Sequence, residues 1–271
     1  MRCTDDALVL RRTPFRETSL LVHFFTRQDG LLAAVARGVR ATGRAATTLD
    51  RAVLAGFHTL ATGRYARSAH ALSTLTAVEI RHPRHRLLHR PAALLAAQVV
   101  QEILYRFMAP FEPNPSVFEL LEWTWNGLEA GDDPLALIGL CQGRLIRALG
   151  YGWRTDCCVG CGTTEQIAYF SVKRGQVVCE RCAAPYVGVS RPVRHGPGNR
   201  PANPPLFPLG SHLHEVLHHL EWSGTWANLP QPDQAMVYRI GMACLLRLGG
   251  TPLLADAPFR QMIGLPPVEP C

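Results

Sequence analysis

Four cysteines constrain this chain more than any other feature of its sequence. They form two C-x-x-C pairs, Cys158/Cys161 and Cys179/Cys182, with seventeen residues between the pairs. Each pair turns tightly enough to present two thiolates to one side, and two such pairs make a closed tetrahedral shell of sulfur ligands for Zn²⁺. Zinc with four thiolate ligands has no open coordination position. We therefore expect one structural zinc ion that stabilises the fold and takes no part in catalysis.

The residues around the two pairs fit this interpretation. Gly160 and Gly162 stand where the backbone must bend around a metal, and the spacer between the pairs has the character of a short two-stranded β-ribbon. We place this zinc ribbon at 156–186. Cys157 could replace Cys158 only by lengthening the pair to C-x-x-x-C, so we leave it outside the shell with its role open. Four buried thiols, or two disulfides, are the alternatives.

Composition limits the class of protein. A chain of 271 residues is long enough for two domains or one large one. The opening M-R-C-T-D-D-A-L has no apolar core of a secretory signal, and the longest apolar run, at 92–100, is too short to span a bilayer. We expect a cytoplasmic protein without a membrane partner, whose cysteines are reduced or bound to metal.

The charge is concentrated in the first third of the chain. Residues 1–90 contain fifteen arginines against six acidic residues, whereas the remainder has a small acidic excess. A basic excess on one domain is typical of proteins that bind the phosphate backbone of nucleic acids. A solvated basic face without a partner is the alternative.

The first eighty residues have the pattern of β-strands. Short apolar runs occur at 7–12, 19–26, 31–37, 51–60 and 71–80, and Asp29-Gly30 is a strong hairpin signal between the second and third runs. Five short strands without a convincing helix predict a small closed barrel, and we expect an OB-fold nucleic-acid-binding domain over 1–80. An SH3-like barrel is the competing interpretation.

Helical periodicity replaces the strand pattern after a basic segment that contains two prolines. This segment, 81–91, is the predicted hinge, and 92–271 is the predicted helical domain. Apolar residues recur at helical spacing in three stretches: Leu95, Val99, Ile103 and Phe107; Val117, Leu120, Leu121 and Leu128; Leu137, Cys141, Leu145 and Leu149. Asn114 and Asp133, each before a proline, are predicted helix starts, and Gly150 is a predicted stop.

The last part of the chain is less regular. The segment 185–210 is so rich in proline and glycine that we expect a mobile loop, followed by helices at about 210–222 and 233–248 that complete the ordered chain. The whole pattern predicts an α+β multidomain protein. Its N-terminal OB-fold β-barrel is followed by an all-α helical lobe with an inserted Cys₄ zinc ribbon.

One motif indicates an enzyme. His214-Glu215-x-x-His218 matches the H-E-x-x-H pattern, in which two histidines on one helix face bind zinc and the glutamate activates a water molecule. The segment is simply rich in histidine, however, and a third ligand would have to be Asp233 or Asp256 without any recognisable context. Signatures of phosphate-binding loops, serine hydrolases, dinucleotide-binding folds and zinc deaminases are absent from the sequence.

The strongest local signal for nucleic acid lies after the third predicted strand. Arg37, Arg40 and Arg44 enter a loop that contains glycine and threonine, and Arg11, Arg12 and Arg16 lie at the end of the first strand. Arginine binds phosphate through two parallel hydrogen bonds. Aromatic residues of the barrel could stack on bases, although most are more simply core: Phe24, Phe25, Phe57 and Tyr65.

The order of these parts resembles one family, the bacterial recombination-mediator and DNA-repair protein RecO. The stretch A-L-V-L-R-R-T-P-F-R-E-T-S-L-L-V-H-F-F-T-R-Q-D-G-L-L-A-A-V-A-R-G-V-R is similar to its N-terminal barrel, and the helical lobe interrupted by C-V-G-C and C-E-R-C is similar to its C-terminal part. The resemblance covers most of 7–186. Many members lack the cysteines, so zinc is inferred from this sequence's own spacing.

The resemblance implies a protein without catalytic turnover, associated with the nucleoid. Such proteins bind single- and double-stranded DNA, anneal complementary strands, and with RecR help load recombinase onto strands coated by single-strand-binding protein (SSB). The implied DNA contacts are Arg37, Arg40 and Arg44, with Arg11 and Arg16 as neighbours. An apolar pocket near Arg144 or Arg147 would suit the acidic C-terminal tail of SSB. The alternatives are a zinc metallopeptidase built on His214, Glu215 and His218, or a zinc-stapled nucleic-acid adaptor of another pathway.

Overall fold

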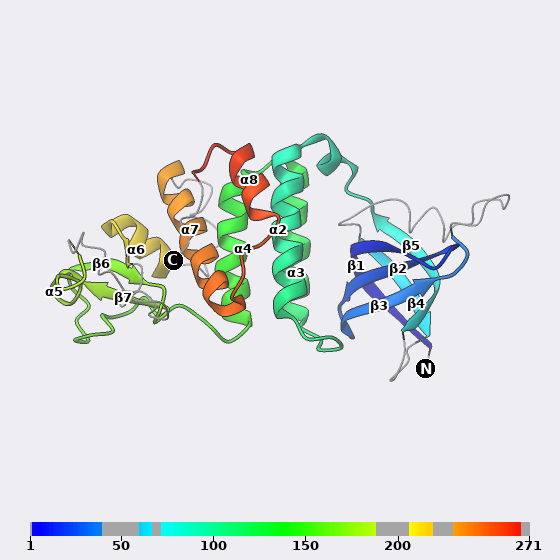
Figure 1. Ribbon diagram of the computed structural model, residues 1–271, viewed down its shortest axis with the longest axis horizontal. Coiled ribbons are helices and arrows are strands. Elements are labelled where there is room, and N and C mark those ends of the chain that lie inside the picture. The colour runs from blue at the N-terminus through cyan, green and yellow to red at the C-terminus, as the bar shows by residue number, and fades with distance from the viewer. Residues whose placement is uncertain (1, 40–59, 67–71, 188–205, 219–229, 267–271) are drawn as a thin grey trace, which may run out of the picture. The chain divides into compact units, whose positions relative to one another are not determined.

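The computed structural model describes residues 2–39, 60–66, 72–187, 206–218 and 230–266. The chain divides into two compact units, Met1–Gly131 and Asp132–Cys271. The first unit contains a β-barrel and two long helices. The second contains further helices and a small sheet that carries the cysteine pairs (Figure 1).

Five strands close the barrel in the order β1-β2-β3-β5-β4, with β4 returning to β1. Their bounds are β1 Arg2–Phe15, β2 Ser19–Thr26, β3 Gly30–Ala36, β4 Leu60–Ala66 and β5 Ser73–His82. Neighbours pair in antiparallel fashion except β3 and β5, which run parallel. This closed, partly parallel arrangement is the predicted OB-fold and not the competing SH3-like barrel.

Alternation along the strands builds the barrel core. On β2 and β3 every second residue faces inward, which places Leu20, Val22 and Phe24 against Leu32 and Ala34. The intervening residues are also buried in several places, among them Leu8, Phe25 and Leu31. A strand that is buried on both faces needs a second layer to cover it, and the helices of the same unit supply that layer.

Two helices, α2 Pro91–Phe107 and α3 Pro115–Ala130, belong to the barrel's unit. The Phe25 ring stacks on Phe118 of α3 with centroids 6.3 Å apart, and Arg27 lies over the same ring at 4.5 Å. The loop between the helices pairs with β3, where the Phe111 amide donates to the Leu31 carbonyl at 2.9 Å. The Asn114 side chain caps α3 at its start, as predicted from the sequence.

The segment expected to be a hinge, 81–91, has its own structure. Strand β5 continues to His82, and a short 3₁₀ helix, η1, spans His85–His89. Between them Arg84 is 1% exposed and donates two hydrogen bonds to Asn126 Oδ1, at 3.0 and 2.7 Å. Burial lowers the pKa of Arg84 to about 10, against the influence of two nearby carboxylates. This segment is packed against α3; the domain limits 1–80, 81–91 and 92–271 themselves stay predictions.

In the second unit α4 Pro134–Ala148 packs against α7 Gln231–Gly249. Asp133 caps α4 through two backbone amides, as predicted, and Gly150 follows the helix with a left-handed φ of 84°. The fully buried Gln142 approaches Gly241 so closely that an added Cβ would meet its Oε1 at 2.5 Å. Glycine at this position therefore sets the distance between the two helices.

The second sheet has three strands in the order β7-β6-β8: β6 Ile167–Ser171, β7 Gln176–Cys179 and β8 Leu206–Pro208. The hairpin of β6 and β7 is the predicted ribbon. Strand β8 corrects the expectation of an irregular loop over the whole of 185–210, because Phe207 pairs with Phe170 on β6. Of that loop, 188–205 lies outside the described residues.

Three helices complete the second unit: α5 Glu180–Ala183, α6 Ser211–His218 and α8 Asp256–Met262. Helix α8 was not predicted, since the sequence was expected to be ordered only to about residue 248; buried Phe259 and the hydrogen bond from Tyr238 to Asp256 hold it in place. The predicted fourth strand, 51–60, lies outside the described residues except for Leu60, where β4 begins. Within the described ranges, no helix combines the length and apolar character needed to cross a bilayer.

Candidate metal centre and nucleic-acid interface

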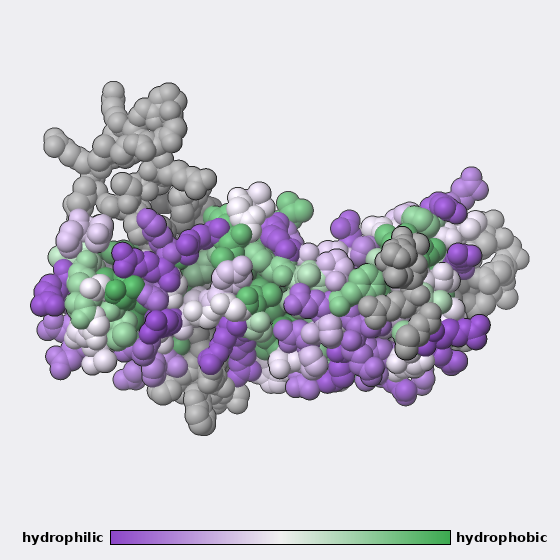
Figure 2. Space-filling view, turned by 90° about the horizontal axis from the view of Figure 1, so that it is seen from below, coloured by the Kyte–Doolittle hydropathy of each residue, from purple (hydrophilic) through white to green (hydrophobic). Residues whose placement is uncertain are grey.

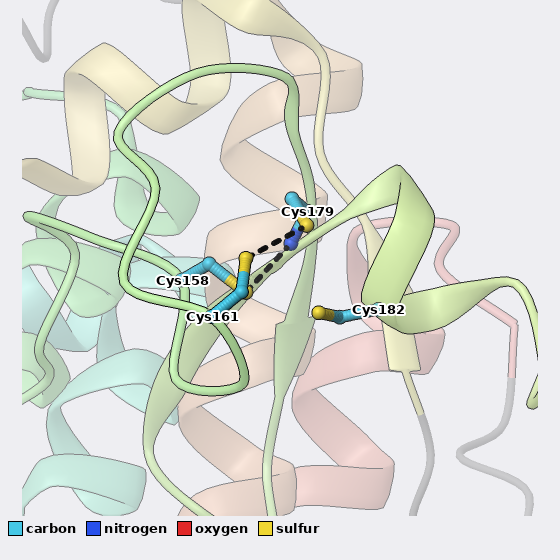
Figure 3. Close-up of side chains that lie close together, drawn as sticks. All are labelled: Cys158, Cys161, Cys179 and Cys182. Carbon is cyan, nitrogen blue, oxygen red and sulfur yellow. Dashed lines mark hydrogen bonds between the residues drawn. The ribbon is translucent and has the colours of Figure 1, made fainter.

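The four cysteines predicted as zinc ligands come together. The Sγ atoms of Cys158, Cys161, Cys179 and Cys182 all lie within 4.8 Å of one another (Figure 3). Two of them come from the loop before β6, one from the end of β7 and one from α5. In the described part of the chain this is the one group of three or more potential metal ligands. The spacing read from the sequence therefore corresponds to a real cluster in space.

The loop that carries Cys158 and Cys161 is held by the backbone. The Cys158 amide donates to the Thr163 carbonyl at 2.7 Å, and the Gly162 amide donates back to the Cys158 carbonyl at 2.8 Å. Gly162 has a left-handed φ of 76°. Gly160 is required for space, because a Cβ there would lie 2.9 Å from Cys182 Sγ. Glycine is therefore favoured at both positions, at Gly162 by the backbone conformation and at Gly160 by the space available.

Backbone amides point at the sulfur atoms. The amides of Gly160 and Cys179 both donate to Cys158 Sγ at 3.3 Å. Burial raises the pKa of Cys158, but these donors outweigh it and bring the pKa to about 6. The pKa of Cys182 is raised to about 12, because Cys161 and Cys179 beside it favour its protonated form. Four crowded sulfur atoms become thiolates together only when a cation compensates their charge, as Zn²⁺ does.

The alternatives for the cysteines fit less well. The Sγ atoms of Cys161 and Cys179 lie 3.7 Å apart, far beyond a disulfide bond of about 2.05 Å, and all four cysteines of the cluster are free thiols. Cys161 is exposed and Cys182 half-buried, so this is no set of four buried thiols. Cys157 contacts Asp156 at 3.7 Å and lies outside the cluster, as expected.

The two histidines of the H-E-x-x-H motif contact Thr155 and are not part of the cysteine cluster. On α6, His214 Nε2 donates to the Thr155 carbonyl at 2.7 Å, and His218 Nδ1 lies 3.2 Å from the Thr155 hydroxyl. Both rings thus contact Thr155, a residue that no sequence pattern singled out. Glu215 is exposed. Among the described residues, no carboxylate joins the two histidines at ligand distance.

Neither aspartate considered as a third ligand is near this pair. Asp256 accepts a hydrogen bond from Tyr238 and lies 3.3 Å from Arg260 Nε, and Asp233 lies in the first turn of α7. The motif is therefore explained as a helix that packs through its apolar residues and bonds the chain around Thr155. No observation favours a metallopeptidase.

The predicted DNA contacts are partly brought together. Arg16 lies in the turn between β1 and β2, and Arg37 directly follows β3. Because Phe15 pairs with Ser19 and Leu20 pairs with Ala36, both arginines stand at the start of β2, and both are exposed. Arg11 is exposed further along β1, beside the register shift between Val9 and Arg11. Arg40 and Arg44 lie outside the described residues.

The aromatic residues considered for base stacking are core residues. Phe24, Phe25 and Tyr65 are at most 2% exposed, and the Tyr65 hydroxyl donates to Asp29 Oδ2 at 2.6 Å. Phe57 lies outside the described residues. These three side chains stabilise the barrel and are closed to a nucleic-acid base.

A small pocket of about 60 Å³ lies on the second unit where an SSB-tail site was expected. Arg144 and Arg147 of α4 line it together with Trp153, Leu217 and His218. Burial lowers the pKa of Arg144. A partly desolvated guanidinium beside apolar side chains is suited to a carboxylate attached to an apolar group.

Comparison with known proteins decides the family. A family model described as "Recombination protein O N terminal" matches residues 1–84, and one described as "Recombination protein O C terminal" matches 88–190. The chain belongs to the RecO family. It is 23% identical to the DNA repair protein RecO of Bacillus pumilus (strain SAFR-032) over 223 residues, which are 82% of this chain and 79% of that protein.

Other RecO proteins agree with this assignment. The DNA repair protein RecO of Listeria innocua is 26% identical over 177 residues, 65% of this chain and 67% of that protein, and that of Bacillus velezensis is 24% identical over a stretch of the same length. Membership implies a role in DNA repair and recombination. The match to the two models ends at residue 190, so β8 and helices α6 to α8 lie beyond it.

Proposed function

We propose that this RecO protein is a mediator of DNA repair and homologous recombination without catalytic turnover. It binds single- and double-stranded DNA, anneals complementary strands, and with RecR helps load recombinase onto SSB-coated DNA. The observation that carries the proposal is the OB-type barrel of a RecO-family chain, with Arg16 and Arg37 exposed beside the same strand end.

The barrel is the proposed DNA-binding part because of its charge and its exposed arginines. Arg11, Arg16 and Arg37 extend from β1 and β3 into solvent, and Arg40 and Arg44 follow in the sequence. Five guanidinium groups supply phosphate contacts without reading base identity, which suits a protein that must act at any sequence. Its buried aromatics leave this surface dependent on electrostatics.

We assign one structural Zn²⁺ to Cys158, Cys161, Cys179 and Cys182. The set offers four sulfur donors, the preference of zinc in structural sites, and amide donors stabilise the thiolate of Cys158. When bound, the ion joins the loop before β6 to β7 and α5. Holding the ribbon together is the role we assign to it.

The tail of SSB is assigned to the pocket between α4 and α6. An acidic tail that ends in an aromatic residue gains affinity by burying its ring, and the guanidinium groups of Arg144 and Arg147 orient its carboxylates. DNA and SSB would then be bound by different units of the chain. We expect the protein to work in the cytoplasm on the nucleoid.

The DNA assignment is tested by replacing Arg16, Arg37, Arg40 and Arg44 with alanine and measuring affinity for duplex DNA against salt concentration. Each lost phosphate contact lowers the slope of log K against log salt by about 0.9, so the slope should fall by up to about 3.6. Arg154→Ala, an exposed arginine of the other unit, is the control. An unchanged slope in the fourfold variant would refute the barrel as the DNA-binding surface.

The mediator role is tested with SSB that lacks its tail. Deleting the tail should abolish annealing of coated strands and leave annealing of naked strands intact. Arg147→Ala should reproduce this selective loss. Equal loss of both activities, or of neither, would favour an adaptor of another pathway.

A further inference from the structure

The ribbon carries a pocket whose space none of the proposed activities uses, although Gly160 and Cys182 of the candidate metal centre form part of its wall. Its volume is about 340 Å³, which is within the range of sites for small ligands. Val159, Val178 and Leu206 give it apolar walls, and Lys173 and Arg174 bring two cations to it. In the space-filling view, apolar side chains on the ribbon are bordered by hydrophilic ones (Figure 2).

The hairpin between β6 and β7 fixes the backbone from which the two cationic side chains extend. The amides of Arg174 and Gly175 both donate to the Ser171 carbonyl, at 3.2 and 2.8 Å, and Gly175 has a left-handed φ of 63°. A tight turn of this kind fixes the backbone of Lys173, the chain's single lysine. Both side chains are exposed, and no acidic residue is among those that line the pocket.

An exposed aromatic side chain completes the pocket. Tyr186 is 51% exposed, and its amide donates to the Ala183 carbonyl at 2.8 Å, which anchors the residue to the turn after α5. The barrel aromatics Phe24, Phe25 and Tyr65 are buried by contrast. An exposed ring beside two cations is the combination with which proteins bind single strands, because the ring stacks on a base while the cations hold phosphates.

The neighbouring sequence has matching charge. Residues 188–205, which connect the end of this turn to Leu206, contain three arginines and no acidic residue. The two cations that line the pocket, with no acidic residue among the lining residues, favour a polyanion as its occupant over any neutral peptide.

We propose that this ribbon pocket binds one unpaired nucleotide of a DNA strand, with the base against Tyr186 and the flanking phosphates on Lys173 and Arg174. The inference rests on the proposed DNA-binding function and adds to it a second contact on the second unit. Duplex DNA cannot use the pocket, since its bases are already stacked and paired. The barrel would thus hold strands of either kind, and the ribbon would recognise single strands alone.

The test compares full-length variants in binding to an oligothymidine of about thirty nucleotides and to a duplex of equal length. Lys173→Ala/Arg174→Ala should lower the salt slope for the single strand by about 1.4, two contacts at 0.7 each, and leave the duplex slope unchanged. Tyr186→Ala should weaken single-strand binding at least about fivefold, whereas Tyr186→Phe should not. Arg154→Ala, exposed on the ribbon but outside the pocket, should have no effect.

Photocrosslinking tests the contact between the base and Tyr186 without relying on a binding affinity. An oligonucleotide with 5-bromodeoxyuridine should crosslink to Tyr186 on irradiation, and the adduct is mapped by mass spectrometry. Zinc content of each variant reports that the ribbon remains folded. Unchanged single-strand binding in the ribbon variants, while the fourfold arginine variant loses affinity, would overturn this inference alone. Failure of the wild-type protein to bind any DNA would overturn the proposed function as well.

The same variants would also show whether the pocket binds an acidic peptide instead of a nucleotide. If Lys173→Ala/Arg174→Ala left DNA binding intact but abolished binding of an acidic C-terminal peptide, the pocket would be a peptide site. That result would overturn the assignment to a nucleotide.

Discussion

The barrel and the ribbon hold their strands together by different means. Among the described residues, thirteen buried side chains contribute to the barrel core, including Val22, Phe24 and Leu32. In the described part of the ribbon, the cluster around the cysteines contains four buried residues, and two of these are the metal-ligand candidates Cys158 and Cys179. Burial of apolar surface stabilises by about 25 cal/mol per Å², so the barrel core has a larger driving force than the cluster around the cysteines of the ribbon.

This difference explains why a metal ion would contribute more to stability at the ribbon than at the barrel. On the cysteine side of this three-stranded sheet, so few side chains are buried that apolar burial offsets little of the conformational entropy that folding costs, although Phe170 and Val177 are buried elsewhere on β6 and β7. Small domains with a limited core often depend on disulfides or metals, and this side of the ribbon offers four thiols in place of a larger core. The comparison predicts that changes at the thiols affect the ribbon alone and that changes at the barrel leave zinc in place.

The largest expected effect is that of Cys158→Ser/Cys179→Ser. Because metal binding to such sites contributes on the order of 10 kcal/mol, the double variant should lose its zinc and the ribbon should unfold. Metal analysis should find one zinc per wild-type chain and less than about a tenth of this in the variant. Amide hydrogen exchange should become fast in β6 and β7 and remain slow in β2 and β3.

His214→Ala is the matched control for that experiment. It removes a potential metal ligand that bonds Thr155 in the structure, so zinc content should stay at one per chain. Retention of zinc by the double cysteine variant, or its loss with His214, would show that the cluster in Figure 3 is not the metal site.

The second prediction addresses the barrel. Gly30 has a left-handed φ of 67°, and a Cβ there would lie 2.1 Å from the Glu112 carbonyl oxygen. Gly30→Ala combines backbone strain with a steric clash that no flexible side chain relieves, so the barrel should lose about 3 kcal/mol of stability. Hydrogen exchange of the β2 and β3 amides measures this loss, and zinc content should not change.

Gly38→Ala separates the effect of backbone strain from the effect of the steric clash. Gly38 has nearly the same φ, 69°, but nothing lies within 4 Å of an added Cβ. Its substitution should cost only the backbone strain, about 1 kcal/mol. Equal effects of the two substitutions would mean that the contact between the Asp29-Gly30 turn and the loop after α2 contributes nothing to stability.

Sequence patterns predicted correctly those features whose structure depends on residues close together in the chain. The hairpin at Asp29-Gly30, the helix caps Asn114 and Asp133 and the two C-x-x-C pairs were all predicted, because each depends on neighbouring residues alone. Only the structure showed that the glycine of the hairpin also contacts a helix loop more than eighty residues later.

Features that depend on distant partners were missed. Strand β8 has three residues and exists by pairing with β6, and Arg84 is buried through Asn126 although its segment is rich in charge. The pocket beside Tyr186 depends on a hairpin, a turn and β8 meeting in space, which no local pattern reports.

The third prediction tests how far the ribbon depends on close packing around the thiols. Gly160→Ala places a methyl group 2.9 Å from Cys182 Sγ, beside the amide that donates to Cys158 Sγ. Displacing a ligand or its hydrogen-bond donor typically weakens metal affinity by about tenfold or more. Competition with a chelator measures this, and Gly210→Ala, with nothing within 4 Å of its Cβ, is the control.

The smallest effect concerns a buried carboxyl group of the barrel. Asp5 is 6% exposed and accepts a hydrogen bond from the Gln28 amide at 2.7 Å. Burial raises its pKa above the ordinary 3.8, and hydrogen bonds offset only part of that shift. The folded barrel therefore binds this proton more tightly than the unfolded chain does, so its stability falls as pH rises from about 3.8 through the raised pKa.

Asp5→Asn should remove that pH dependence. Asparagine can still accept the Gln28 hydrogen bond and carries no charge, so the variant barrel should be more stable than the wild type near pH 7. The advantage should shrink as pH falls through the raised pKa and should be smallest below 3.8, where the wild-type carboxyl group is mostly protonated in both states. Hydrogen exchange of β1 amides in the two proteins, corrected for intrinsic rates at each pH, measures the difference. A variant that is less stable at every pH would show that the ionised carboxylate stabilises the turn by more than its burial costs.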